Sequence, residues 1–170
     1  MTVRIRPART SDVRTIRVLV DTYAVDRRLL SKATVALFEG VQEFVVAEEA
    51  SGRLVGCGAL HVMWEDLAEV RTIAVDPAVQ RRGIGSAILT ALLERARNLG
   101  ISRVFCLTFE TEFFARHGFE AIDESPVAPD VYEQLLRSFD EGVAEFLDLE
   151  RVKPNTLGNQ RMLRRLTEHT

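Results

Sequence analysis

The chain has 170 residues, of which 46% are hydrophobic and 28% charged, and its formal net charge is −3. This balance is typical of one globular domain, residues 1–170, and the slight acidity argues against a nucleic-acid-binding protein. The two cysteines have no metal or disulfide spacing, and no apolar stretch is long enough for a signal peptide or a membrane span. We therefore expect a cytoplasmic protein with no metal and no membrane partner.

The first half of the chain predicts strands interleaved with two short helices. Residues 3–8 alternate like a strand, and a helix then begins near Asp12, with Val13, Ile16, Val20 and Tyr23 as its apolar positions. A second helix is expected from Ser31, with Val35 and Phe38 on its apolar face. Residues 43–63 read as a β-hairpin around "ASGR", and 68–77 as a further strand.

The second half predicts an alternation of helices and strands. Residues 83–99 form the clearest helix, in which Ile84, Ile88, Leu92 and Ala96 recur at every fourth position. Strands are predicted at 103–108, 119–122 and 161–166, and helices at 111–118 and 129–139. The order predicts an α/β fold with a mixed sheet flanked by helices.

The stretch "TIAVDPAVQRRGIGSAIL", residues 72–89, carries the chemical signal. A strand ends, and a loop with Gly83 and Gly85 opens a long helix whose first N–H groups are unpaired. Arg81 and Arg82 add positive charge, so the loop is typical of a phosphate or pyrophosphate site. It matches neither the P-loop nor the dinucleotide fingerprint. The structural alternative is a glycine-opened helix that only packs on a strand.

The segment from Gln80 to Gly85 matches the Q/R-x-x-G-x-G/A signature of the GCN5-related N-acetyltransferase (GNAT) family, which this chain resembles. The resemblance implies a mixed sheet splayed between strands 4 and 5, with acetyl-CoA in the splay. By the same resemblance, backbone groups of the loop face the pyrophosphate, and those of the preceding strand face pantetheine. The implied cofactor residues are Thr72, Ile73, Val75, Gln80, Arg81, Arg82, Gly83, Ile84, Gly85, Ser86 and Phe114.

The stretches "AEVRTIAVDP", "ISRVFCLT" and "FFARHGF" together resemble the acetyltransferase domain of N-acetylglutamate synthases, in its short actinobacterial form. This narrower resemblance implies acetylation of the α-amino group of L-glutamate or L-glutamine, the first step of arginine biosynthesis. Longer synthases carry a kinase-like domain that binds arginine, for which this chain has no room. Family members are often homodimers, and the sequence does not itself indicate the oligomeric state.

The synthase resemblance also assigns catalytic residues. Glu69 is the implied general base, and a carboxylate of ordinary pKa needs burial or a bridging water for that role. Thr72 offers a backbone N–H to the thioester or substrate. Thr108 places a hydroxyl near the departing sulfur. Phe114 occupies the position where many family members have a tyrosine that protonates the thiolate, so this role would pass to Thr108 or to solvent. The alternatives are a salt bridge for Glu69 and local backbone bonding for Thr108.

An α-amino acid also needs a cation for its carboxylate. Arg71, two residues beyond Glu69 on the same strand, is the best-placed candidate. Lys32, Lys153 and Asn159 are further candidates, each with surface exposure as the alternative. Two other functions stay open: an acetyltransferase for protein N-termini or other small amines, and a non-catalytic acetyl-CoA-binding module.

Overall fold

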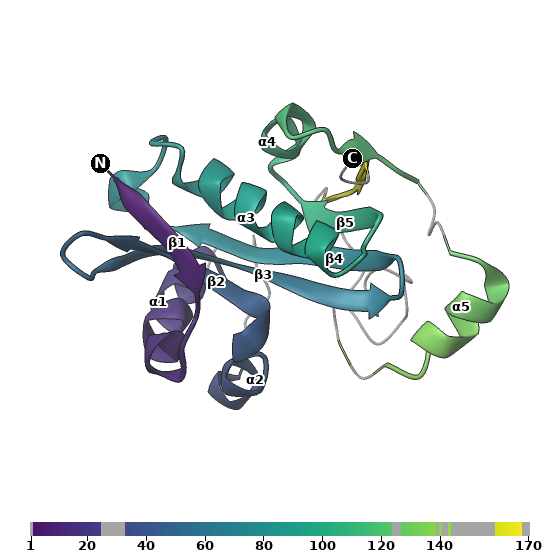
Figure 1. The fold of residues 1–170 in the computed structure, drawn as a ribbon, viewed down its shortest axis with the longest axis horizontal. Coiled ribbons are helices and arrows are strands. Elements are labelled where there is room, and N and C mark those ends of the chain that lie inside the picture. Colours follow the sequence, from purple (N-terminus) through teal and green to yellow (C-terminus); the bar gives the residue numbers. More distant parts are fainter. Residues whose placement is uncertain are drawn as a thin grey trace. The chain divides into compact units, whose positions relative to one another are not determined.

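The computed structural model describes residues 2–24, 33–123, 127–138, 140, 143 and 159–167. Its strands form a seven-stranded mixed sheet in the order β1-β2-β3-β4-β5-β7-β6 (Figure 1). The chain divides into two compact units, Met1–His61 with Val70–Leu99, and Val62–Glu69 with Gly100–Thr170. The α/β class, the mixed sheet and the predicted order of elements are confirmed.

The first unit contains the N-terminal strands and three α-helices. Strands β1 (Val3–Pro7), β2 (Phe44–Glu49) and β3 (Leu54–Trp64) pair antiparallel in sequence order, and β4 (Leu67–Val75) follows β3 in the sheet. The helices are α1 (Val13–Ala24), α2 (Thr34–Glu39) and α3 (Ile84–Asn98), and short 3₁₀ turns precede α1, β2 and the loop to α3.

Helices cover both faces of the strands in this unit, with α1 and α2 on one side and α3 on the other (Figure 1). Between the strands and the helices α1 and α2 lies a buried hydrophobic cluster that includes Ile16, Leu37, Val46, Cys57 and Ala74. On the other side, a Cβ on Gly58 would lie 2.6 Å from Cγ2 of Ile88, so only glycine allows α3 to approach β3 this closely.

Helix α2 presents a different face from the one its sequence predicts. Val35 and Phe38 are exposed, at 62% and 39%, whereas Leu37 is buried and joins the core. The helix has only six residues, which is too short for apolar periodicity to identify a face. The expected start at Ser31 lies outside the described residues.

The second unit is built on β5 (Arg103–Thr108) and β7 (Gln160–Arg165), which pair antiparallel, with β6 (Glu120–Ala121) beyond them. Helices α4 (Thr111–Arg116) and α5 (Pro129–Leu135) complete the described elements. The parallel ladder between β4 and β5 joins Leu67–Glu69 to Arg103–Phe105 and ends there, as the predicted splay requires.

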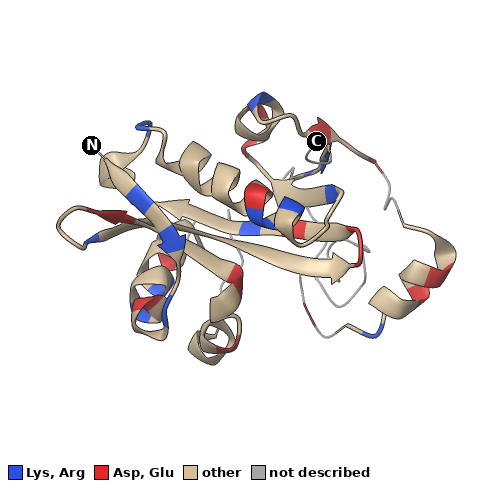
Figure 2. Ribbon diagram, viewed as in Figure 1, with Lys and Arg blue, Asp and Glu red and all other residues tan. Residues whose placement is uncertain are grey.

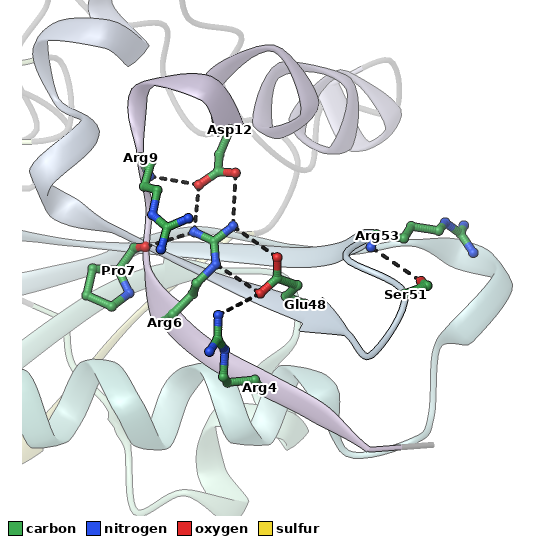
Figure 3. Close-up of polar contacts among 8 residues, drawn as sticks. All are labelled: Arg4, Arg6, Pro7, Arg9, Asp12, Glu48, Ser51 and Arg53. Carbon is green, nitrogen blue, oxygen red and sulfur yellow. Dashed lines mark hydrogen bonds and ion pairs between the residues drawn. The ribbon is translucent and has the colours of Figure 1, made fainter.

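A charged cluster joins β1, β2 and the start of α1 (Figure 3). The Arg6 guanidinium donates to both carboxylate oxygens of Asp12, at 2.8 and 3.1 Å, and its Nε donates to Glu48 at 3.1 Å. The side chains of Arg6 and Asp12 are only 11% and 9% exposed. Hydrogen bonds from Arg6 hold the pKa of Asp12 below its ordinary value and do the same for Glu48.

We expect Asp12→Asn to lower the free energy of unfolding at pH 7 by roughly 2–3 kcal/mol, because a nearly buried Arg6 loses a charged partner. A carboxyl whose pKa is lowered by folding stabilises the protein above its ordinary pKa, and this stabilisation is lost as the pH falls. The difference between wild type and variant in urea unfolding should therefore be largest near neutral pH and shrink below about pH 4.

Asp21→Asn is the matched control, since Asp21 forms an exposed ion pair with Arg17 one helical turn away. That variant should change stability by less than about 0.5 kcal/mol. Equal effects of the two substitutions, or an Asp12→Asn effect that grows toward low pH, would contradict the assignment.

Candidate active site

The glycine loop between β4 and α3 is exposed and has a fixed backbone shape. Arg81 and Gly83 both adopt positive φ angles, 65° and 77°, and α3 begins at the next residue, Ile84. Figure 2 shows basic residues on this loop, where Arg81, Arg82 and Gly83 are all exposed. Apart from its chain neighbours, a Cβ on Gly83 would meet no heavy atom within 4 Å, so the space at this position is open. The helix N-terminus therefore presents N–H groups and positive charge to solvent.

Side chains anchor the base of this loop. The Asp76 carboxylate accepts a hydrogen bond from the Ala78 N–H at 2.9 Å and forms an ion pair with Arg53, the residue before β3. The Asp76 N–H donates to the Val55 carbonyl at 2.8 Å. These contacts fix the direction in which the chain leaves β4.

Thr72, in the middle of β4, has a left-handed backbone with φ of 60°. This conformation is rare for a β-branched residue and interrupts the alternation of a strand. Ile73 lies beside Gly58 on the α3 side, and Ala74 belongs to the core on the α1 side. Sequence patterns gave no signal for this interruption, because threonine is a common strand residue.

Arg71 lies near an acidic and an imidazole side chain of the same unit. One of its terminal nitrogens is 3.7 Å from Glu43 Oε1, an ion-pair distance longer than a hydrogen bond. Glu43 Oε2 is also 2.7 Å from Nδ1 of His61. His61 follows the core residue Ala59 by two positions, so both side chains lie on the α1 face of β3. The Arg71 side chain is only 9% exposed, so its charge acts in a partly desolvated setting.

The second unit holds Glu69 and Thr108, both buried, at 6% and 8% exposure. Glu69 is the last residue of the ladder with β5, where it faces Phe105. The Thr108 hydroxyl oxygen accepts a hydrogen bond from the Glu110 N–H at 2.8 Å. A hydroxyl has one proton and two lone pairs, so this bond leaves the Thr108 proton to be donated to another group.

Phe114 is packed within an aromatic cluster on α4. Its ring lies 5.1 Å from Phe113 and 5.1 Å from Phe119, and both contacts are edge-to-face. The pKa of His117, at the end of α4, is lowered by burial and by the charges of Arg164 and Arg116. The Arg164 guanidinium also donates to the His117 carbonyl at 2.7 Å.

Neither cysteine is suited to act as a nucleophile. Burial raises the pKa of the Cys57 thiol to about 12. Burial also raises the pKa of Cys106, and the nearby charge of Glu69 adds to that effect. Since the thiolate is the reactive form, both residues act as small core hydrophobes.

Of three further predicted substrate residues, the structure describes one. Lys32 and Lys153 are outside the described residues, and Asn159 is half-buried directly before β7. Among the residues that the structure describes, no group of three or more His, Cys, Asp or Glu side chains could hold a metal ion. Within those same ranges, no helix is long and apolar enough to cross a membrane.

The sequence profile of the Acetyltransferase (GNAT) family matches residues 15–119. The chain belongs to this family. A Mycobacterium tuberculosis protein named amino-acid acetyltransferase is 61% identical over 161 residues, which cover 94% of this chain and 92% of that protein. An amino-acid acetyltransferase of Neisseria meningitidis is 36% identical over 124 residues, and these cover 72% of this chain but only 28% of that protein.

Solved structures of this acetyltransferase family agree with the fold. Rv2747 from Mycobacterium tuberculosis, in complex with CoA and NLQ, is 60% identical with a TM-score of 0.93, over 96% of this chain and 99% of that one. N-acetylglutamate synthase from Neisseria gonorrhoeae, complexed with coenzyme A and N-acetyl-glutamate, is 28% identical with a TM-score of 0.78. That match covers 99% of this chain and 36% of the synthase, so this chain spans about a third of its length.

Proposed function

We propose that this acetyltransferase transfers the acetyl group of acetyl-CoA to the α-amino group of L-glutamate or L-glutamine, as the first step of arginine biosynthesis. The observation that carries the proposal is the 61% identity, over nearly the whole chain, to a protein named amino-acid acetyltransferase. The CoA-bound relatives support acetyl-CoA as co-substrate. We assign a residue of this chain to each chemical step that such a transfer needs.

The loop from Gln80 to Ser86 is the proposed site for the coenzyme's pyrophosphate. Its exposed arginines and the first N–H groups of α3 suit a diphosphate, and glycine at position 83 leaves the approach open. Upstream, the backbone of Ile73 and Val75 is proposed to pair with pantetheine. The positive φ of Thr72 reorients its peptide groups, which supports a role for its N–H at the thioester or substrate.

Glu69 is the proposed general base. A substrate ammonium must lose a proton before its nitrogen can attack the thioester carbonyl carbon. The attack forms a C–N bond, the C–S bond then breaks, and coenzyme A leaves as a thiolate that takes up a proton. Glu69 is 6% exposed, so its carboxylate is shielded from bulk water and can receive the amine proton directly or through one water.

Thr108 is the proposed proton donor to the departing thiolate. Its oxygen already accepts from the Glu110 N–H, which orients the hydroxyl and leaves its proton for the sulfur. Phe114 has no proton to give. A thiolate is a good leaving group, since thiols have a reference pKa near ~8.5, so a hydroxyl donor is sufficient.

Arg71 is the proposed partner of the acceptor's α-carboxylate. A guanidinium can bind one carboxylate with two parallel hydrogen bonds while another acidic group, here Glu43, lies beside it at ion-pair distance. Lys32, Lys153 and Asn159 remain further candidates for substrate binding. A peptide or an aminoglycoside acceptor does not require a carboxylate-binding cation in this place, which separates the proposal from other amine acceptors.

The purified protein should release thiol from acetyl-CoA with L-glutamate or L-glutamine and much less with other amino acids, a peptide N-terminus or an aminoglycoside. Glu69→Gln should lower kcat by roughly 10²-fold, the scale of general-base loss. Glu65→Gln, an exposed carboxylate in the turn before β4, should leave kcat unchanged. Turnover only with a peptide or aminoglycoside would exclude an amino-acid acceptor. Coenzyme binding without turnover on any amine would favour the non-catalytic module.

Gly83→Glu should fold normally and lose coenzyme A binding, because the new carboxylate would occupy the proposed phosphate site. Calorimetric titration with coenzyme A measures this loss directly. Gly52→Glu in the β2–β3 turn is a close control, since Gly52 also has positive φ, 88°, and open space at its Cβ. It should keep wild-type affinity. Normal binding by Gly83→Glu would exclude the loop as the phosphate site.

Thr108→Val should slow turnover at saturating substrates by about tenfold, because the thiolate loses its proton donor. The variant also loses the acceptor for the Glu110 N–H, so Thr108→Ser, which keeps the hydroxyl, serves as the control. The serine variant should retain most of kcat. Equal rates for the valine variant and wild type would remove Thr108 from the mechanism.

A further inference from the structure

Tyr23, in the last turn of α1, joins two parts of the proposed cofactor site. Its hydroxyl donates a hydrogen bond to the Val75 carbonyl, at the end of β4. The same hydroxyl oxygen accepts a hydrogen bond from the Gln80 side-chain amide. All three residues belong to the first compact unit. One hydroxyl therefore connects the strand end to the first residue of the glycine loop, across the turn that begins with Asp76.

The chemistry of these bonds has one consistent direction. A tyrosine hydroxyl has one proton and can also accept, a carbonyl only accepts, and the Gln80 amide nitrogen only donates. The Tyr23 proton must therefore go to Val75, and its oxygen receives the Gln80 N–H. Phenylalanine at position 23 would fill the same volume and break both bonds at once.

We propose that Tyr23 is a positioning residue for acetyl-CoA, acting through Val75 and Gln80 without contacting the reacting atoms. It holds the end of the strand that is proposed to pair with pantetheine at a set position relative to the loop that is proposed to bind pyrophosphate. Asp76, bound to Arg53 and to the Val55 carbonyl, fixes the same turn from its other side. The inference rests on the proposed cofactor loop and is independent of which amine is the acceptor.

Such a residue should act on coenzyme affinity and leave the chemical step unchanged. Backbone N–H groups can bind a diphosphate tightly only if the loop is already ordered, because ordering it on binding reduces the affinity. Tyr23 orders the loop before the coenzyme arrives. The tyrosine hydroxyl is bonded to Val75 and Gln80, neither of which is a proposed reacting group, so its loss should leave the chemical step unchanged.

Tyr23→Phe tests the inference in the full-length protein. The KM for acetyl-CoA and the calorimetric Kd for coenzyme A should both rise about fivefold, the scale of about one net hydrogen bond. The kcat and the KM for the amino acid should stay within about twofold of wild type. Tyr132→Phe is the matched control, since Tyr132 is the other of the two tyrosines, lies on α5 and packs against the core cluster of the second unit. It should keep the wild-type Kd for coenzyme A.

Gln80→Leu breaks the same bridge from the loop side and gives a second measurement. Its effect on the Kd and that of Tyr23→Phe should be less than additive in the double variant, because both remove one shared hydrogen bond. Additive effects would overturn the bridge. A Tyr23→Phe protein with a lower melting temperature but an unchanged Kd would show a purely structural role and also overturn it.

The result for Gly83→Glu separates this inference from the proposed loop site. If Gly83→Glu still binds coenzyme A, the cofactor loop itself is wrong and the role of Tyr23 falls with it. If Gly83→Glu loses binding while Tyr23→Phe binds like wild type, the loop stands and only the positioning role of Tyr23 is overturned.

Discussion

The left-handed backbone of Thr72 is the constraint on which the rest of the candidate site depends. A β-branched residue at φ of 60° costs roughly 1–2 kcal/mol, so the surrounding fold has to hold it there. Burial of Thr72 and the 3.6 Å contact from the Cys57 thiol to its carbonyl supply part of that restraint. Because the strand is interrupted at Thr72, Arg71 lies beside Glu43 while Ile73 lies on the side of α3. A regular strand would direct these two side chains to the same face.

The loop that follows β4 extends the same logic. Binding through backbone groups depends on the path of the chain, because a peptide N–H cannot adjust by changing rotamer as a side chain can. This path is set by Asp76 at the turn itself and by two side chains from distant parts of the sequence, Tyr23 from α1 and Arg53 from the turn before β3. The backbone position of the exposed loop residues therefore depends on the hydrogen bonds and the ion pair made by Tyr23, Arg53 and Asp76.

The sequence predicts those features that depend on local patterns. The predicted apolar face of α3 is buried, at Ile84, Ile88, Leu92 and Ala96. The sequence identifies this face because a helix of fifteen residues repeats its apolar spacing over several turns. Helix α2 is too short for its spacing to identify a face, and the sequence therefore predicts Phe38 where the structure buries Leu37. The fold class and the glycine loop follow from patterns of the first kind.

Other features of the site have no local signal. The φ of Thr72 and both hydrogen bonds of Tyr23 depend on partners far away in the chain, such as Val75, 52 residues beyond the tyrosine. In the sequence, Tyr23 reads only as an apolar position of α1. The pairing of Arg71 with Glu43 is equally invisible, since the two residues meet only once β4 and the turn before β2 are in place.

In the second unit, packing by Phe114 and the proposed proton donation by Thr108 belong to different side chains. Phe114 is 7% exposed and packs edge-to-face against Phe113 and Phe119, so a phenol there would need a hydrogen-bond partner inside an apolar cluster. The ring packs α4 against Phe119, and in the proposed mechanism the proton comes instead from a group in a polar setting. Thr108 meets that requirement, because its oxygen is already bound by the Glu110 N–H. A hydroxyl is a sufficient donor in this proposal, because a thiolate is a good leaving group.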